Sequence, residues 1–320
     1  MGGRYATQLL EITNNPEKLN DGDFWAIAAN FDGEFRAAKF KTIDENTLFK
    51  HEWNQIEGNW QSTFTEDKYC NYVKEIQECI ANGEVYQVNA CRILKSECDH
   101  SIIGLASKII SENPAKFACY LALPDLEIAS ASPERFLSRS NQKIITSPIK
   151  GTRPLGVVGD FSDKDKSENI MIVDLMRNDL GKICIESSIS VPRLLATEVH
   201  PGLEHLVSDV IGQLRTGTSW AEIFEALSPP GSVSGAPKSS ALSIINKFEG
   251  NARGPYCGIL GWVEGDRAEL SVAIRIFWRI GNQINFGTGA GITWASDPKS
   301  EWDETELKAR KLISIAGGLQ

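Results

Sequence analysis

Hydrophobic residues recur along this chain with two periods, one typical of strands and one typical of helices. Each change from one period to the other marks the boundary of a predicted element. Residues 23–30 and 35–40 are predicted strands, and Asp32-Gly33 between them is typical of a hairpin turn. Apolar positions three and four apart predict helices over 66–81, 101–112, 162–181, 218–227, 236–248 and 298–316. Further strands are predicted over 85–94, in short pieces over 115–149 and 183–215, and over 257–264, 268–279 and 283–288.

The predicted strands come in groups joined by short turns, which favours antiparallel pairing over a series of βαβ units. We therefore expect an α+β fold with large antiparallel sheets and helices outside them. Residues 1–62 are poorly patterned, so they are expected to form a short N-terminal strand region packed on a core of residues 63–320. No repeat, low-complexity segment or obvious linker divides the chain.

Composition narrows the class of protein. Hydrophobic residues make up 42% of the chain, enough for a large core, but no run approaches the ~18 apolar residues of a membrane helix. The first five residues lack an apolar signal core, so we expect a cytoplasmic protein. A net charge of −9 without a basic tract argues against nucleic acid as a partner. The seven cysteines include no Cys-x-x-Cys pair, which argues against a zinc site.

The stretch from Ser147 to Pro154 gathers residues that break regular structure around one lysine. Pro148 fixes its own φ and donates no hydrogen bond, and Gly151 permits a close approach or an unusual backbone angle. A stiff turn is a favourable place for a reactive amine, because little entropy is lost in positioning it. Lys150 is therefore a candidate nucleophile, and a solvated lysine on a surface turn is the alternative.

Carboxylates at helical spacing form two candidate ligand pairs. In the last predicted helix, Glu301, Glu304 and Lys308 are three and four residues apart and share one face. Asp165 and Glu168 have the same spacing near the start of the helix over 162–181. If the two pairs face each other, their oxygen atoms suit Mg²⁺. The alternative is that these acids favour only the dipoles of their own helices.

Two further features could bind an anion. Residues 288–291, Thr-Gly-Ala-Gly, can present backbone N–H groups as a nest. Arg275 lies in an otherwise apolar strand, and a buried arginine needs an anionic partner. That partner is either a bound anion or a carboxylate of the protein. Because an acidic chain repels anions at long range, an anionic substrate would need such local positive charge.

Read together and in order, motifs over residues 65–318 resemble the chorismate-utilising enzymes. This family includes anthranilate synthase component I, aminodeoxychorismate synthase component I, isochorismate synthase and salicylate synthase. The resembling segments are 131–136 (ASPERF), 148–153 (PIKGTR), 168–180 (ENIMIVDLMRNDL), 234–238 (SGAPK), 272–275 (VAIR), 289–291 (GAG) and 301–305 (EWDET). The resemblance implies two large antiparallel β-sheets packed as a sandwich with surrounding helices, and a chorismate-binding catalytic domain over 63–320.

Two positions separate activities within this family. Aminodeoxychorismate synthases resemble this chain in having a lysine at Lys150, where anthranilate synthases have alanine. Isochorismate and salicylate synthases carry a base lysine where this chain has Gln87, and glutamine cannot deprotonate water. The resemblance thus implies amination of chorismate to 4-amino-4-deoxychorismate, for 4-aminobenzoate and folate synthesis. Anthranilate synthase component I and a catalytically silent chorismate-binding subunit are the alternatives.

The resemblance also implies roles for single residues. Lys150 would attack the ring of chorismate, and Glu134 would act first as general acid and then as base. Only a neutral amine can attack, so we expect burial, magnesium and Arg275 to lower the pKa of Lys150. Glu168 and Glu304 would hold Mg²⁺, with Asp165 and Glu301 in the outer shell; many relatives have glutamate in place of Asp165. The remaining residues implied to bind substrate are Gln87, Thr152, His205, Ser232, Tyr256, Arg275, Gly289, Ala290, Gly291 and Lys308.

The chain has no recognisable glutaminase, because no cysteine lies in a nucleophile-elbow context. The resemblance therefore implies a separate glutamine amidotransferase subunit that supplies ammonia. Two departures from the family stand out. The segment between Gly151 and Glu168 is shorter than in many relatives. The N-terminal region is also shorter, and in anthranilate synthases the tryptophan-binding site is built largely from that region. Feedback inhibition by tryptophan is consequently not expected.

Overall fold

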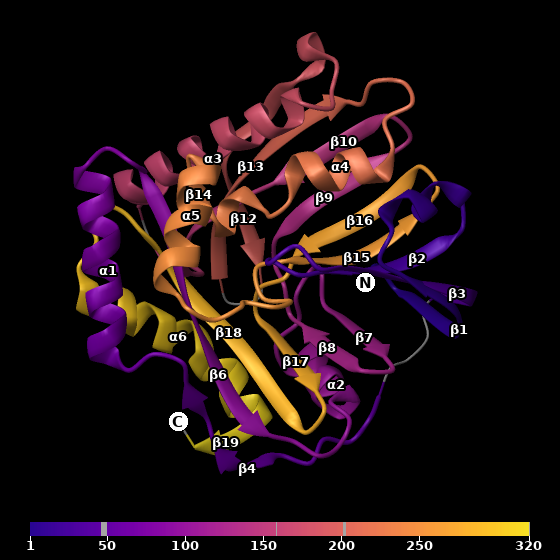
Figure 1. Ribbon diagram of the computed structural model, residues 1–320, viewed down its shortest axis with the longest axis horizontal. Helices are drawn as coiled ribbons and strands as arrows, with labels where there is room; N and C mark the ends of the chain where they lie inside the picture. The colour runs from indigo at the N-terminus through magenta and orange to yellow at the C-terminus, as the bar shows by residue number, and fades with distance from the viewer. Residues whose placement is uncertain (46–49, 158, 201–202, 320) are drawn as a thin grey trace.

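Two antiparallel sheets form the framework of the computed structural model, which describes residues 1–45, 50–157, 159–200 and 203–319 (Figure 1). The predicted α+β fold is confirmed. The larger described sheet has the order β1 (Arg4–Thr13), β3 (Phe35–Glu45), β2 (Phe24–Ala29), β15 (Ile259–Glu264), β16 (Arg267–Val272), β9 (Arg135–Ser140), β10 (Lys143–Ser147), β13 (Leu203–Gln213) and β11 (Ile149–Pro154), with β12 (Ser190–His200) also paired to β13. The second has the order β14 (Gly235–Ala236), β6 (Gln87–Glu97), β18 (Gln283–Ile292), β17 (Ile276–Ile280), β8 (Leu126–Ser130) and β7 (Cys119–Leu123), with β5 (Gln61–Ser62) on β6. A short pair, β19 (Gly317–Leu319) and β4 (Ile56–Asn59), is parallel.

Every predicted helix is present. The α-helices are α1 (Glu66–Ala81), α2 (Ile103–Glu112), α3 (Asp163–Gly181), α4 (Trp220–Leu227), α5 (Lys238–Phe248) and α6 (Pro298–Ala316), and short 3₁₀ turns occupy η1 (Pro16–Asp21), η2 (Glu186–Ser188) and η3 (Gly231–Val233). Four of the α-helices start at a side chain that accepts the backbone N–H three residues on, which satisfies one of the unpaired amides of the first turn. These N-caps are Thr65, Ser162, Ser219 and Asp297. Within the described ranges, no helix is both long and apolar enough to cross a bilayer.

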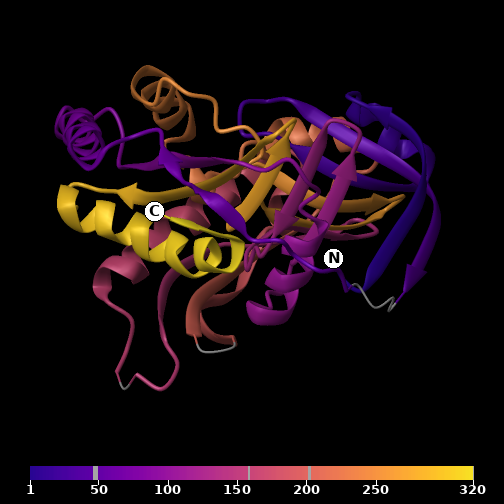
Figure 2. The same ribbon diagram turned by 90° about the horizontal axis from the view of Figure 1, so that it is seen from below.

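Helix α6 covers one face of the second sheet and lies along β18 in both views (Figure 2). The hydroxyl of Thr288 in β18 donates to the carbonyl of Thr305 in α6 at 2.8 Å. Arg92 of β6, which is almost fully buried, donates through Nε to the hydroxyl of Thr305 at 2.9 Å. These bonds hold α6 at Thr305 against β6 and β18. They therefore also set the position of the acidic residues that precede Thr305 in the helix.

Two hydrophobic clusters hold the layers together. The larger one joins the sheets, because it contains Leu137 and Leu270 of the larger sheet as well as Val88 of the second. The smaller one lies under α2 and α6 and includes Leu105 and Leu312, which pack with aromatic residues of β17 and β18. Burying a side chain of this size contributes about 1.5–3 kcal/mol, so each cluster stabilises the packing of the layers that it joins.

The prediction of a single strand over 268–279 is wrong, because the chain changes sheets inside it. β16 pairs with β9 and β15 in the larger sheet, whereas β17 pairs with β8 and β18 in the second. Arg275, between the two strands, has φ +53°, in the left-handed region. A sequence that is apolar on both sides of this residue gives no sign of the change, because each half is a buried strand in its own sheet.

The stretch around Lys150 is a bulged edge strand rather than a stiff turn, so that prediction is corrected. Pro148 ends the pairing of β10, and β11 then pairs with β13 at the end of the sheet. The register of β11 shifts between Lys150 and Thr152, where Gly151 has φ +75°. Proline is tolerated at a sheet edge and glycine at a bulge, which explains how a segment rich in both remains a strand.

The nest predicted over residues 288–291 is also absent. β18 runs to Ile292, and these residues pair with β6 in extended conformation, Gly289 opposite Cys91 and Gly291 opposite Asn89. The predicted strands over 85–94 and 283–288 therefore begin or end at different residues, as β6 and β18. The N-terminal region adds a strand that the pattern did not predict, β1, and together with β2 and β3 it continues the larger sheet through β15.

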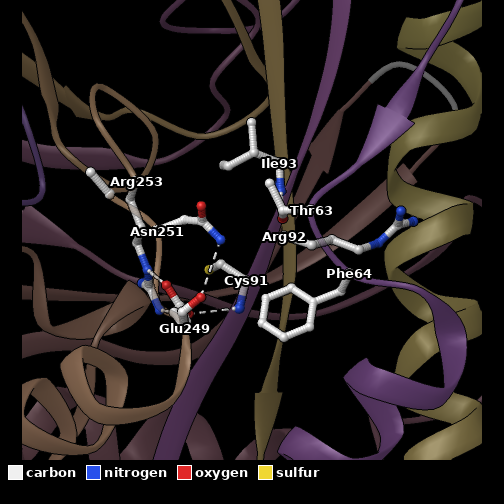
Figure 3. Close-up of a pocket in the computed structure, with 9 residues that line it drawn as sticks. Thr63, Phe64, Cys91, Arg92, Ile93, Glu249, Asn251 and Arg253 are labelled. Atoms are coloured by element: carbon white, nitrogen blue, oxygen red, sulfur yellow. Dashed lines mark hydrogen bonds and ion pairs between the residues drawn. The ribbon is translucent and has the colours of Figure 1, made fainter.

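A buried ion pair joins Glu249, directly after α5, to Arg253, and Figure 3 shows the pair beside Cys91 of β6. Arg253 donates through Nε to Glu249 Oε2 at 2.8 Å, and its terminal nitrogens reach the carbonyls of Val233 at 3.0 Å and Asn89 at 2.6 Å. Glu249 also accepts the N–H of Cys91 at 3.0 Å. The residues around the pair enclose only about 10 Å³, room for one water molecule, so this space belongs to the framework and not to a ligand.

Replacing Arg253 with methionine is expected to destabilise the protein by about 3–5 kcal/mol, because Glu249 would stay buried without a counter-charge. The double variant R253M/E249M should lose less, since it leaves no buried charge unpaired. The control is Arg36→Met, which breaks a partly exposed pair with Asp125 and should cost about 1 kcal/mol or less. Urea unfolding measures the loss in the free energy of unfolding. Equal losses in R253M and R36M would show that Glu249 is not left buried without a counter-charge.

Candidate active site

Two segments of the chain cross side by side from one sheet to the other, and each carries a candidate residue. The link between β8 and β9 carries Glu134, and the link between β16 and β17 carries Arg275. The N–H of Ala131 donates to the carbonyl of Arg275 at 3.0 Å, and the N–H of Val272 donates to the carbonyl of Glu134 at 3.1 Å. The backbone therefore locks the two crossings together and places a carboxylate and a guanidinium in the same region.

Glu134 is buried, with 4% of its surface exposed. Burial raises the pKa of its carboxyl group to about 7, although the Ser232 hydroxyl, the Lys150 ammonium and the Ile149 N–H all favour the charged form. A carboxyl group with a pKa near neutrality can both give and take a proton at physiological pH. This position therefore suits the acid–base role that the resemblance implies.

Lys150 enters the same space from the edge strand β11. Its Nζ donates to the carbonyl of Ser232 at 3.2 Å. Burial lowers the pKa of the ammonium, although the carboxylates of Glu168 and Glu134 oppose this. The direction matches the expectation, and the neighbouring cation that contributes is Lys308 rather than Arg275. A lysine held in this way is not the solvated lysine of a surface turn.

The predicted metal carboxylates lie near the starts of α3 and α6, and Lys164 of α3 lies within 4 Å of one carboxylate from each helix. Glu168 accepts from the Gln87 amide at 3.2 Å, Glu304 pairs with Lys308 at 2.6 Å, and Glu301 accepts from the Ser296 hydroxyl at 2.6 Å. Burial raises the pKa of Glu168. Burial acts in the same direction on Glu304, but Lys308 outweighs it, so the pKa of Glu304 is lowered overall.

Asp165 lies at the edge of this group. Its carboxylate accepts the hydroxyl of Ser162, the N-cap of α3, at 2.7 Å. A side chain on Gly151 would lie only 3.0 Å from Asp165, so the bulge of β11 packs directly against it. Within the described residues, no three acidic, histidine or cysteine side chains are close enough together to form a ready metal cluster.

Sequence reasoning missed Lys164, which lies between the two acidic helix ends. Its Nζ is 3.5 Å from Glu301 Oε1 and 3.9 Å from Glu168 Oε1. The four-residue spacing from Lys164 to Glu168 was a signal that could have found it. The carboxylates thus fit a cation that contacts both helices, since an ammonium group already bridges them.

Arg275 is the candidate anion anchor. Neither an ion pair nor a side-chain hydrogen bond to a described residue engages its guanidinium, and Glu134 acts on it only through its charge. The alternative that Arg275 simply pairs with a protein carboxylate is therefore not supported in the part of the chain that the structure describes. A guanidinium without such a partner can receive a carboxylate in a bidentate manner.

Alternate residues of β18 turn their backbone N–H groups away from β6. The Gly289 carbonyl accepts Lys308 Nζ at 2.9 Å, and the N–H of Cys91, opposite Gly289, donates to Glu249 instead of to β18. Because N–H and C=O of one strand residue point the same way, the amides of Gly289 and Gly291 face away from β6, and that of Ala290 faces it. A Cβ on Gly291 would lie 2.6 Å from the Gln87 amide nitrogen, so glycine keeps this edge open.

The remaining candidate residues lie on the elements around Lys150 and Glu134. Thr152 and His205 are paired across β11 and β13, and their side chains are 2.8 Å apart from Oγ1 to Nδ1. Ser232 in η3 binds Lys150 through its carbonyl and Glu134 through its hydroxyl. Tyr256 is buried against β18, where a Cβ on Gly287 would lie 2.0 Å from its ring. The structure thus joins Lys150, Glu134 and Ser232 directly, whereas Tyr256 packs against β18.

The chain is similar to a known protein family along most of its length. The model of the chorismate binding enzymes matches residues 20–314. The chain is 34% identical to "Anthranilate synthase component 1 1" of Haloarcula marismortui over 269 residues, covering 81% of this chain and 55% of that protein. It is also 34% identical to "Aminodeoxychorismate synthase component 1" of Escherichia coli over 269 residues, covering 81% of this chain and 59% of that protein. The chain therefore spans less than two thirds of the length of these curated relatives.

Solved structures show the same fold. Anthranilate synthase component I from Streptococcus pneumoniae superposes with a TM-score of 0.84 at 19% identity, covering 97% of this chain and 91% of that one. The menaquinone-specific isochorismate synthase of Escherichia coli superposes with a TM-score of 0.81 at 17% identity, covering 98% and 85%. On the family match and the curated relatives together, this chain belongs to the chorismate binding enzymes.

Proposed function

We propose that this chain is the chorismate-aminating component of an aminodeoxychorismate synthase, and that it forms 4-amino-4-deoxychorismate from chorismate and ammonia. The observation that carries the proposal is the position of Lys150. Its amine is held by the carbonyl of Ser232 beside Glu134, and burial lowers its pKa. A lysine in this setting is available as a neutral nucleophile at a lower pH than a lysine in water.

Anthranilate synthase component I is the second candidate. Curated relatives with that name and with the name aminodeoxychorismate synthase are equally similar to this chain, at 34% identity. Overall similarity therefore does not separate the two reactions. Lys150 favours the first, because an amine at this point would be an unused buried charge in an enzyme that lacks a lysine intermediate.

Chorismate is a dicarboxylate with a ring hydroxyl, and the site offers positive groups for it. Arg275, Lys308 and the amides of Gly289 and Gly291 would bind the two carboxylates. Ala290 would shape the strand between those amides. Thr152, His205 and Tyr256 would contact the ring or its side chain. Gln87 donates a hydrogen bond to Glu168 at 3.2 Å and would position that carboxylate. A glutamine side chain cannot act as a base, so it would not activate water.

Glu168 and Glu304 would hold magnesium, with Asp165 and Glu301 farther from the ion. When bound, magnesium would supply positive charge that neutralises a substrate carboxylate. The oxygen-rich donor set suits a hard cation, and the ammonium of Lys164 between Glu168 and Glu301 marks where a positive charge is accommodated.

The protein groups can account for the covalent steps. The Nζ lone pair of Lys150 would form a bond to the ring while the C–O bond to the hydroxyl breaks, and Glu134 would give its proton so that water leaves. Ammonia would then form a bond to the carbon that lost the hydroxyl as the C–Nζ bond breaks and returns the free amine. Glu134, now a carboxylate, would take the proton that the new ammonium group releases. A separate glutamine amidotransferase subunit would supply the ammonia.

Product analysis with chorismate, ammonium salt and magnesium tests the proposal. We expect no anthranilate fluorescence, and we expect a product that yields 4-aminobenzoate only after a pyruvate-eliminating lyase is added. Anthranilate formed directly would favour the second candidate. The absence of any product, with chorismate still bound, would identify a silent chorismate-binding subunit.

The lysine intermediate predicts a change in protein mass. Wild-type protein incubated with chorismate and magnesium, without ammonia, should gain the mass of chorismate minus water. Lys150→Ala should gain nothing, because the nucleophile is missing. Lys143→Ala removes an exposed lysine at the start of β10 and should gain the mass as wild type does. An adduct that persists in K150A would show that another residue attacks.

Glu134 predicts a pH effect on stability. Its pKa of about 7 in the folded protein lies above the ordinary value of 4.5, so the folded state binds more protons between these values. Stability contributed by this group therefore falls as the pH rises from about 4.5 to 7. Glu134→Gln does not titrate, so its stability relative to wild type should rise by about 2.5 kcal/mol between pH 5 and pH 8.

Urea unfolding at the two pH values, without magnesium or chorismate, measures this difference. Glu225→Gln, which removes an exposed carboxylate of α4, reports any general effect of losing a negative charge. A difference between E134Q and wild type that is the same at pH 5 and pH 8 would rule out the raised pKa.

A further inference from the structure

Lys164 lies in the first turn of α3 and reaches across to α6. Its Nζ is 3.9 Å from Glu168 Oε1 on its own helix and 3.5 Å from Glu301 Oε1 on the other. The two carboxylate side chains are 16% and 5% exposed, whereas the lysine side chain is 48% exposed. The ammonium therefore stands at the mouth of the acidic group, with water on its outer side.

The carboxylates need a positive charge at this point even without a ligand. Glu168 and Glu301 lie within 4 Å of the Lys164 ammonium, and Glu304 acts on it through its charge. Like charges at short range in a partly buried setting repel strongly. Lys308 neutralises Glu304, and Lys164 does the same for the carboxylates that Lys308 does not reach.

A divalent ion and this ammonium cannot occupy the same place. A magnesium ion held by Glu168 would sit ~2.1 Å from one of its oxygens, and the ammonium lies 3.9 Å from the same carboxylate, so the two positive charges would compete for Glu168. Lys164 has a flexible four-carbon stem and is half exposed, so it can turn into water at small cost. Glu301 and Glu168 cannot follow, because Ser296 and Gln87 hold them in place.

We propose that Lys164 is a built-in counter-ion that occupies the carboxylate site until a divalent cation displaces it. The inference rests on the proposed magnesium site. Its consequence is that the free protein binds magnesium weakly, since each ion must first release an ammonium group. Lys164 is then a positioning residue that keeps α3 and α6 together in the metal-free protein.

Lys166 provides a matched control on the same helix. It carries the same charge two residues farther on, but its Nζ pairs with Asp160 and not with the acidic group. Lys164→Gln and Lys166→Gln therefore remove the same net charge from α3, and only the first removes it from between Glu168 and Glu301. A difference in metal affinity between the two variants therefore reports the position of the lost charge and not the total charge.

The test is titration of the full, metal-free chain with Mg²⁺ by calorimetry, and with Mn²⁺ by electron paramagnetic resonance, without chorismate. K164Q should bind both ions about five- to tenfold more tightly than wild type, and K166Q should change the Kd by less than twofold. In EDTA, K164Q should unfold at a lower temperature than K166Q, and saturating Mg²⁺ should remove that difference.

The possible outcomes separate this inference from the proposed function. A Kd for K164Q that equals or exceeds that of wild type, with wild type binding metal normally, would overturn the counter-ion role and leave the metal site standing. Metal binding by none of the three proteins at millimolar concentration would overturn the magnesium site and the inference with it. Neither result would affect the lysine adduct, which is measured separately.

Discussion

The site depends on the hydrogen bonds that hold the two crossings of the chain together. Glu134 and Arg275 belong to different links, yet their own carbonyl groups accept the bonds that join those links. Each link is short and enters a paired strand at both ends, so neither has much freedom to move. The distance between the carboxylate and the guanidinium is consequently set by the two sheets, and the large antiparallel framework serves to position a small number of charged groups.

Electrostatics explains how an acidic chain of net charge −9 could receive a dianion. Positive groups are concentrated at the junction of the sheets, where Arg275, Lys150 and Lys308 converge on Glu134 and the acidic helix ends. Burial moves the pKa of Glu134 up and that of Lys150 down, so the two groups approach each other in proton affinity. At a given pH, more of Glu134 is therefore protonated and more of Lys150 is neutral than either group would be in water. This pairing would be lost if either group were moved to the surface.

The sequence predicted the helices well and the strands unevenly, for a physical reason. Caps such as Ser162 and Asp297 lie next to the helices that they start, so the information is local. Strand ends depend on distant partners: Gly289 lies in an extended strand because Cys91 is opposite it. The break at Arg275 depends on which sheet each half joins, and no local pattern records that. The resemblance supplied candidate residues, but the bridge from Lys164 to Glu301 requires two helices that are far apart in the chain.

Arg275 illustrates a conflict between backbone and side chain. A left-handed φ of +53° costs a residue with a side chain about 1 kcal/mol or more, whereas glycine would adopt it freely. Glycine would ease the passage between the sheets but would leave no guanidinium beside Glu134. An arginine at this position therefore gives up folding stability in exchange for charge. It follows that the left-handed turn between β16 and β17 is a cost that the fold bears so that a guanidinium stands beside Glu134.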